Sequence, residues 1–371
     1  MQKPAIKEYP FYLKSTVILL GLILLCFALM NLKDILAPIA FALIISILLN
    51  PIVLFFQRLK INHIVSIFIA ILIAFVLIGG LIYFLSEQVM KFSQNFPLMK
   101  VKFFAIFSQL QHWIAAHFGI SLAKQTQMIN QGMSSSQAIV GQTLGSALGG
   151  LALVFLVPVY VFLLLYYKKL ILNFLYEIFA EENSTKVEDV LGETKVAIQS
   201  YMVGLILEGI AVAILNSAAL LILGVEYAIL LGVIGAILNV LPYIGGLIAI
   251  ALPVLVSMIS SNSISTPIWI IISYIIIQFI DNHILIPLLV SSRVKINAFF
   301  SIFIVLLGGF IWGVTGMFLS IPFLAIIKII FVRIPELKPW GKLLGDEVPT
   351  LHKRQIWKRR FSRRAIPEVK T

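Results

Sequence analysis

The chain has 371 residues, of which 60% are apolar and 12% are charged. Soluble domains carry about 25% charged residues, so this composition excludes a soluble globular protein. The mean hydropathy is +1.05, and several apolar runs exceed the roughly 18 residues that a membrane-spanning helix needs. The sequence therefore predicts an all-α polytopic membrane protein that lies in a lipid bilayer.

The net charge of +12 reflects 28 Lys and Arg against 16 Asp and Glu, and much of the excess lies just outside the apolar runs. Clusters of this kind mark the cytoplasmic ends of membrane spans. They occur before the first run at Lys3 and Lys7, and after the fourth run at Lys168 and Lys169. We therefore expect both termini to be cytoplasmic.

The first part of the chain is predicted to hold three spans and then an external region. Within residues 1–86 the spans cover 15–30, 34–56 and 64–86. The next region, 87–148, is too polar for the bilayer core, and it carries apolar side chains at helical spacing, namely Phe103, Phe107, Leu110 and Ile114. This stripe predicts an amphipathic helix on the membrane surface or in an oligomer contact. Packing against its own chain is the alternative.

Residues 149–197 are predicted to form a fourth span and a cytoplasmic connector helix, and residues 198–332 a transport core. The remaining residues, 333–371, form a basic tail that carries seven Lys and Arg side chains within 352–364. Basic segments with interleaved aromatic residues suit the anionic cytoplasmic leaflet. We expect no nucleic-acid partner, because charge alone is unspecific in a protein held in the bilayer.

Two apolar runs of the core are too long for one straight span. They cover 228–260 and 298–330, or 33 residues each, which make about 50 Å of helix against a bilayer core of about 30 Å. Each run also has a helix-breaking centre, Pro242 to Gly246 in the first and Gly308 to Gly316 in the second. We predict that both are broken helices or re-entrant hairpins.

Charge favours hairpins over straight spans. With two hairpins, the loop that contains Arg293 and Lys295 lies in the cytoplasm, whereas two straight spans would place it outside. The hairpin interpretation gives about eight membrane segments in all.

The same interpretation predicts an inverted repeat in the C-terminal half. A span that starts near 199 is followed by a break near 244, and a span that starts near 267 by a break near 312, so both spacings are 45 residues. Inverted repeats are a common plan in transporters, with the binding site at the interface of the repeats. Coincidence of the two lengths is the alternative.

Ionisable side chains inside apolar spans are the first candidates for function, because a charged group at membrane depth is costly. Glu208 leads them, because it lies near the middle of its span in a stretch from Val196 to Ser292 without Lys or Arg. A carboxylate in this place can exchange a proton for a cation as access alternates. A permanently neutral Glu that is hydrogen-bonded between helices is the alternative.

Near the end of the following span, Gln278, Asp281 and Asn282 share a helix face and offer amide and carboxylate groups. They predict a cation or polar-solute site, with a polar cap at the membrane surface as the alternative. Other candidates for the transport pathway lie near the helix breaks: Asn216, Asn239, Pro242, Tyr243, Gly245, Gly246, Gly308, Gly309, Gly313, Thr315 and Gly316. No cofactor is expected, and the one metal site considered is for sodium near Glu208 or Asp281.

The sequence carries few signs of an enzyme. It has no hydrolase elbow, phosphate-binding loop, zinc motif or dinucleotide fingerprint. The single cysteine, Cys26, cannot form a disulfide or a thiolate cluster within the chain. An enzyme is therefore not expected, and the alternative is an intramembrane acid–base enzyme that uses Glu208, Asp281 and His283.

Several segments of the core are similar to those of one protein family. They are Leu223 to Gly232, Asn239 to Gly246, Gln278 to Pro287, Gly308-Gly309 with Trp312 to Gly316, and Ile321-Pro322. In these segments, and over nearly its whole length, the chain resembles the autoinducer-2 exporter family of bacterial membrane transporters, also called PerM-like permeases. The resemblance implies an inner-membrane transporter with about eight membrane segments that forms homo-oligomers.

Members of this family are described as exporters of autoinducer-2 or as sodium (lithium)/proton antiporters. We expect an ion-coupled secondary transporter that exports a small polar metabolite or signal, with a sodium/proton antiporter as the alternative and a non-transporting scaffold third. Many members have a basic residue and then Gly-Gln after the Tyr that starts the fifth span, whereas Met202, Val203 and Gly204 follow Tyr201 here. The polar group appears instead as Glu208. If the usual pair contacts the solute, this chain is expected to carry a different one.

Overall fold

The computed structural model describes residues 10–127, 154–178, 184–240, 244–260, 265–290 and 296–346. These residues are almost entirely helical, and their only β-type pairing is a single bridge between Ile296 and Gly345. The labelled elements are, in chain order, α1 (Phe11–Asn31), α2 (Lys33–Arg58), α3 (His63–Phe118), α5 (Lys168–Ile178), α6 (Ser184–Ile222), α7 (Ala228–Asn239), α8 (Ile244–Ser260), α9 (Ser265–Ile280), the π-helix η2 (Asp281–Val290), α10 (Ala298–Trp312), α11 (Val314–Arg333) and α12 (Lys338–Leu344).

Six helices of the described residues are long and apolar enough to span a membrane, or seven when the helix Val154–Tyr166 and α5 are taken as one bent span. The chain is therefore an all-α polytopic membrane protein, as the sequence predicted. The expected count of about eight segments also includes α7 and α8, taken together as one hairpin. With 12 and 17 residues, neither helix is long enough to be a full span by itself. That count stays a prediction.

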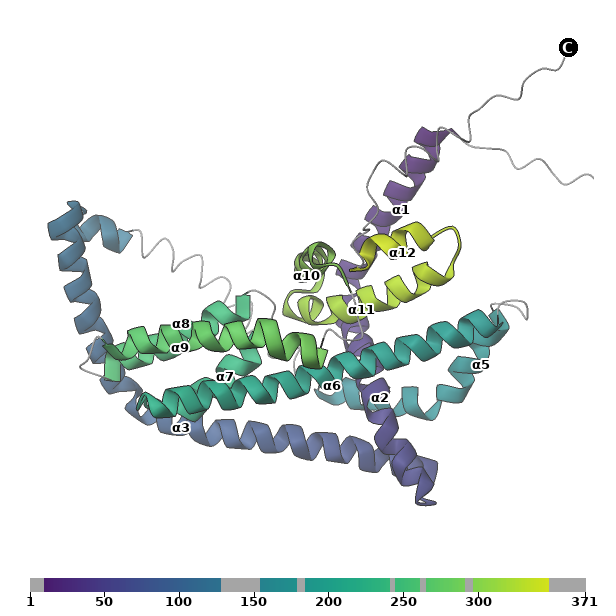
Figure 1. The fold of residues 1–371 in the computed structure, drawn as a ribbon, viewed down its shortest axis with the longest axis horizontal. Helices are drawn as coiled ribbons and strands as arrows, with labels where there is room; N and C mark the ends of the chain where they lie inside the picture. The colour runs from purple at the N-terminus through teal and green to yellow at the C-terminus, as the bar shows by residue number, and fades with distance from the viewer. Residues whose placement is uncertain are drawn as a thin grey trace, which may run out of the picture.

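The first two predicted spans, α1 and α2, are separated only by Leu32. Leu32 has near-helical backbone angles, with φ −92° and ψ 12°, and α2 continues in the direction of α1 (Figure 1). A reversal between two helices needs a loop of about two to five residues. The reversal that our sequence-based topology requires at this link is therefore not seen.

Two helices are longer than the sequence predicted. α3 has 56 residues and joins the third span to the amphipathic stretch that follows, because only Pro97 interrupts the helical pattern. α6 has 39 residues and joins the predicted connector helix to the fifth span. At 1.5 Å per residue, α3 is about 84 Å long and extends well beyond a bilayer. The later part of the external region, 128–148, and the basic segment 352–364 lie outside the described residues.

α7 and α8 form a helical hairpin, which confirms the first predicted break. Gly235 on α7 faces Ala249 on α8, because a Cβ atom on Gly235 would lie 3.5 Å from the Cβ atom of Ala249. Near the tip, the backbone of Gly245 lies directly against the carbonyl group of Leu238, where no side chain fits. The tip itself, with Pro242 and Tyr243, lies outside the described residues.

α10 and α11 form a second hairpin, which confirms the second break. It turns at Gly313, whose φ of +64° lies in the left-handed region that favours glycine. The Ser320 hydroxyl of α11 donates to the carbonyl oxygen of Ile304 on α10 over 2.9 Å. Gly308 and Gly316 approach so closely that a Cβ atom on either would overlap the backbone of the other. Small residues thus allow the two helices to pack backbone to backbone.

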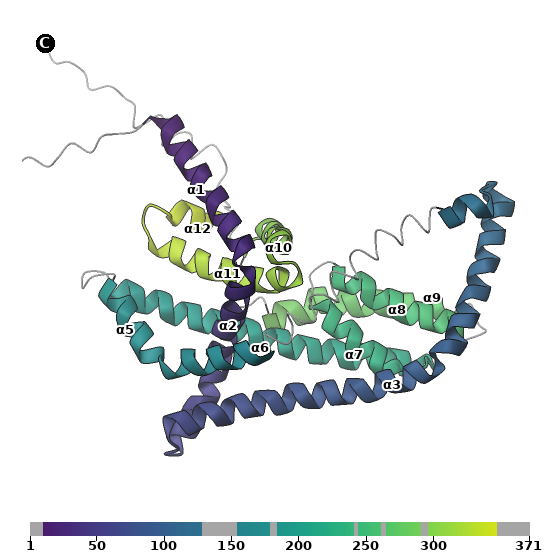
Figure 2. The same cartoon turned by 180° about the vertical axis from the view of Figure 1, so that it is seen from behind.

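α6 is the central element of the C-terminal half, and α2, α7, α9, η2 and α11 all pack against it. Figures 1 and 2 show the α7–α8 hairpin and α9 beside one end of α6, and α10, α11 and α12 grouped toward its other end. A helix followed by a hairpin occurs twice, as α6 with α7–α8 and as α9–η2 with α10–α11. This is the order that the equal spacings predicted, while the inverted relation stays a prediction.

Cysteine labelling tests whether the two hairpins re-enter the membrane from the side they leave. In a Cys26→Ser background, we expect Ser265→Cys to react with an impermeant thiol reagent on intact cells and Ala298→Cys to react only after permeabilisation. The reason is that a hairpin returns the chain to its side of entry. The opposite pattern at both positions would show two straight spans. Glu336→Cys is the control, because both topologies place it in the cytoplasm.

Candidate functional site

Four polar side chains that the sequence singled out meet in the interior of the C-terminal half. Glu208 comes from α6, Asn239 ends α7, Gln278 comes from α9, and Asp281 begins η2. The two carboxylic residues are deeply buried, with exposed fractions of 4% for Glu208 and 1% for Asp281. The structure thus brings together residues that lie up to 73 positions apart in the chain (281 − 208).

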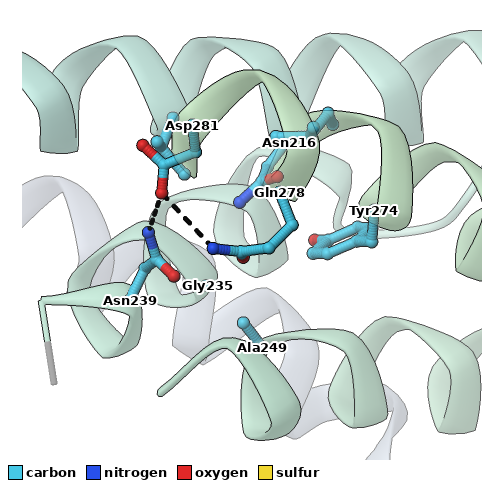
Figure 3. Close-up of a pocket in the computed structure, with 9 residues that line it drawn as sticks. Asn216, Gly235, Asn239, Ala249, Tyr274, Gln278 and Asp281 are labelled. Carbon is cyan, nitrogen blue, oxygen red and sulfur yellow. Dashed lines mark hydrogen bonds between the residues drawn. The ribbon is translucent and has the colours of Figure 1, made fainter. Parts of the chain in front are cut away.

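The Asn239 amide holds the two carboxyl groups together (Figure 3 shows its bond to Asp281). Its Nδ2 atom donates to Glu208 Oε1 over 3.2 Å and to Asp281 Oδ2 over 2.9 Å. The Gln278 amide approaches the same Asp281 oxygen at 3.4 Å. The carboxyl groups of Glu208 and Asp281 thus accept from one amide nitrogen, and they are close enough to act on each other electrostatically. Two carboxylates this close cannot both be ionised cheaply in a low-dielectric interior, so the pair needs a shared proton or a cation.

Helix spacing explains why these residues share one place. On α6, Glu208, Val212 and Asn216 follow one another at four-residue intervals and therefore lie on one face. On α9 and η2, Tyr274, Gln278 and Asp281 are spaced at four and three residues and likewise share a face. The two faces point toward each other, and α7 ends between them at Asn239.

The helix widens from α9 into η2 at Asp281, whereas the sequence predicted an ordinary span here. Proline lacks an N–H group, so Pro287 leaves the carbonyl group of His283 without its usual α-helical donor. A shift to π-helical bonding is one way for a helix to absorb such a mismatch, and π-helical turns are frequent at functional sites. The widened turn begins at the residue whose carboxyl group enters the site.

A small cavity lies beside the carboxyl pair. It is lined by Val212, Asn216, Gly235, Asn239, Ala249, Tyr274, Ile277, Gln278 and Asp281 (Figure 3). The centre of a water-sized sphere can occupy a volume of about 10 Å³ inside it. That space matches a single water molecule or a small ion, and it is too small for an organic metabolite.

Three oxygen atoms of the cavity wall are buried without a hydrogen-bond partner among the residues that the structure describes. They are Asn216 Oδ1, the Tyr274 hydroxyl and Asp281 Oδ1. A buried polar atom without a partner costs about 1–3 kcal/mol, so native structures rarely leave several of them together. Carboxylate, amide and hydroxyl oxygens are the donors that hard cations prefer. The arrangement is therefore suited to a small cation or to a water molecule.

The other predicted site residues lie elsewhere. Asn282 is exposed on η2 and does not line the cavity. Gly246 lies against Gln278, since a Cβ atom there would come within 3.1 Å of Gln278 Oε1. The predicted site residues of the second hairpin do not line the cavity. They are Gly308, Gly309, Gly313, Thr315 and Gly316. Gly308 and Gly316 serve the packing of α10 against α11, and Gly313 forms the turn between them.

Tyr274 is the cavity residue with a polar group that sequence reasoning missed. Aromatic residues are common in apolar helices, so a tyrosine there does not stand out by type. Its spacing was the available signal, since it lies four residues before Gln278 and seven before Asp281, on the face that those residues define.

Comparisons with known proteins give consistent matches. A family profile described as "AI-2E family transporter" matches residues 16–336. "Putative transport protein YueF" of Bacillus subtilis is 26% identical over 317 residues, which cover 81% of this chain and 84% of that protein. A "Putative transport protein" of Haemophilus influenzae is 26% identical over 324 residues, or 84% and 90% of the two chains. "Putative permease PerM" of Escherichia coli is 28% identical over 222 residues, or 59% and 62%.

Replacing the bridging amide tests the geometry of the carboxyl pair. We expect Asn239→Ala to lower the free energy of unfolding by about 1–3 kcal/mol, because both carboxyl groups lose a buried donor. Asn282→Ala is the matched control, and as an exposed substitution it should change stability by less than about 0.5 kcal/mol. Thermal unfolding in detergent compares the two variants. Equal stability of the two would mean that Asn239 does not bridge the pair.

Proposed function

Because the chain belongs to the AI-2E transporter family, as the match over residues 16–336 establishes, we propose that it is an ion-coupled secondary transporter with Glu208 and Asp281 as its coupling site. The curated relatives are named transport proteins or permeases, which points to a membrane transporter and away from an enzyme. The observation that carries the proposal is the buried carboxyl pair that shares the Asn239 amide beside a cavity.

Charge balance supports an exchange of one proton for one monovalent cation. When the two carboxyl groups share one proton, the pair carries a net charge of −1. When the proton leaves and a monovalent cation enters, the site again carries −1. The two occupied states therefore present nearly the same charge to the low-dielectric interior, and neither leaves two adjacent carboxylates uncompensated. An empty, fully ionised pair would be the costly state.

The cavity wall supports sodium or lithium as the competing ion. The unpartnered oxygens of Asn216, Tyr274 and Asp281 supply an amide, a hydroxyl and a carboxylate ligand. The volume suits one small ion with little or no hydration. The bound ion would satisfy at once the polar atoms that have no partner among the described residues.

The position of Asn239 suggests how access alternates. Asn239 is the last residue of α7, next to the tip of the α7–α8 hairpin, while Glu208 and Asp281 belong to long packed segments. A displacement of the tip would therefore break both hydrogen bonds of the amide together and open the pair. Discontinuous helices at a coupling-ion site are a recurring feature of secondary transporters.

Export of a small polar metabolite such as autoinducer-2 is the second candidate, and the description of the family profile favours it. The cavity in the present conformation does not hold a solute of that size. In such an exporter the carboxyl pair would supply the coupling, and the solute would enter only after a hairpin moves. A scaffold that transports nothing does not require a buried carboxyl pair, so we place this function third.

Proton flux in proteoliposomes tests ion coupling. With a pH dye inside the vesicles, we expect a sodium gradient to drive proton movement through the wild type. Glu208→Gln should reduce the flux to that of empty liposomes, because the pair can no longer release its proton. Glu226→Gln is the matched control at an exposed acidic residue and should retain the wild-type rate. Wild-type flux from Glu208→Gln would contradict the proposal, and no flux from folded wild type would favour metabolite export instead.

Removing the hydroxyl of Tyr274 tests whether this group is an ion ligand or a structural group. We expect Tyr274→Phe to raise the sodium concentration for half-maximal flux at least about tenfold, since a polar group that contacts a charge contributes about 1.5–3 kcal/mol, as hydrogen bonds to charged groups do. Thermal stability should not fall, because the hydroxyl has no hydrogen-bond partner to lose in the described parts of the chain. Tyr166→Phe, on an exposed tyrosine, is the control. A loss of stability with an unchanged sodium response would assign the hydroxyl to folding.

A further inference from the structure

Gly235 lies where four helices enclose the cavity. It belongs to α7, and its neighbours across the cavity come from α6, α8 and α9 (Figure 3). A Cβ atom on Gly235 would lie 3.3 Å from Asn216 Nδ2, 3.5 Å from the Cβ atom of Ala249 and 3.6 Å from the Tyr274 hydroxyl oxygen. All three atoms belong to residues that line the cavity. A side chain at position 235 would therefore fill the gap between the cavity walls.

Neither backbone conformation nor close backbone contact requires glycine at this position. Gly235 lies inside a helix, and its φ is not positive. The three atoms nearest to the added Cβ belong to side chains, whereas at Gly245 the nearest atoms belong to backbone. Glycine is also less favourable than alanine inside a helix. What the missing side chain provides at position 235 is space.

That space limits the size of whatever the cavity holds. The centre of a water-sized sphere can occupy only about 10 Å³ there, which suits a single small guest. A methyl group on Gly235 and a bound cation would compete for the same volume. Selectivity among cations depends on cavity size as well as on the number and flexibility of the ligands. Because Gly235 has no side-chain ligand to offer, its effect on selectivity comes from size.

We propose that Gly235 determines which monovalent cation the coupling site accepts, by leaving room for sodium between the cavity walls. This inference rests on the proposed coupling at Glu208 and Asp281. Sodium is a larger ion than lithium, so it loses more affinity when the cavity shrinks. A methyl group at position 235 thus shifts the preference from sodium toward lithium. Ala249 stands on the opposite wall, and removing its methyl group shifts the preference the other way.

The test compares sodium and lithium as driving ions for proton flux in proteoliposomes. The measured quantity is the sodium concentration for half-maximal flux divided by the corresponding lithium concentration. We expect Gly235→Ala to raise this ratio about tenfold, the lower end of the discrimination that one methylene group gives in a fitted pocket. Ala249→Gly should lower it. Gly192→Ala is the matched control, because this exposed helix glycine has no atom within 4 Å of an added Cβ, and it should leave the ratio within about twofold of the wild type.

A double variant separates cavity size from a general structural effect. Gly235→Ala combined with Ala249→Gly moves one methyl group from α8 to α7 and nearly conserves the volume of the site. We expect its ratio to return toward that of the wild type. A merely structural defect of Gly235→Ala would not be relieved, because Ala249→Gly places a further glycine inside a helix.

Two results would overturn this inference and leave the coupling site in place. One is an unchanged ratio in folded Gly235→Ala, and the other is a shift in the same direction from Gly235→Ala and Ala249→Gly. If Gly235→Ala does not fold, as judged by gel filtration, Ala249→Gly decides alone, and an unchanged ratio there overturns the inference. Absence of ion-driven flux from folded wild type would instead overturn the coupling proposal, and this inference with it.

Discussion

The organisation of the transport core depends on one shared hydrogen-bond donor, the Asn239 amide, which joins Glu208 to Asp281 inside an apolar protein. Each carboxyl group would be costly there alone, because a bilayer offers no water to solvate it. Together they require a proton, a cation or both in turn. The three segments that carry the two carboxyl groups and the amide, α6, η2 and α7, therefore have to meet at this point.

The absence of water from the bilayer core also constrains the two hairpins. A broken helix is tolerated at membrane depth only where protein or a hydrated cavity satisfies its free backbone groups. The first hairpin ends beside the carboxyl pair and the cavity, whereas the second turns at Gly313 and packs tightly through Gly308 and Gly316. The first is thus built around polar groups and the second around close backbone contact. This difference is the reason why we propose ion chemistry at the first hairpin.

Much of the fold and part of the site could be predicted from the sequence. Glu208, Asn239 and Asp281 stood out because they are polar in a stretch without Lys or Arg, and both helix breaks followed from length and glycine content. The sequence did not distinguish glycines that pack helices from residues that line the cavity, since both gather at breaks. It also missed the π-helical turn at Asp281, whose local signal is Pro287, and the place of Tyr274 in the cavity wall, whose signal is its spacing from Gln278 and Asp281. The long α3 and α6 show that a change from polar to apolar residues need not end a helix.

The most direct measurement is the number of protons that the purified protein releases when it binds sodium. Sodium chloride is added to the protein in a weakly buffered detergent solution with a pH dye, and choline chloride is the ionic-strength control. If the carboxyl pair exchanges one proton for one cation, about one proton per protomer is released with sodium alone, and none from Glu208→Gln. No sodium-specific release from the wild type, or the same release from Glu208→Gln, would contradict a coupling site at Glu208 and Asp281.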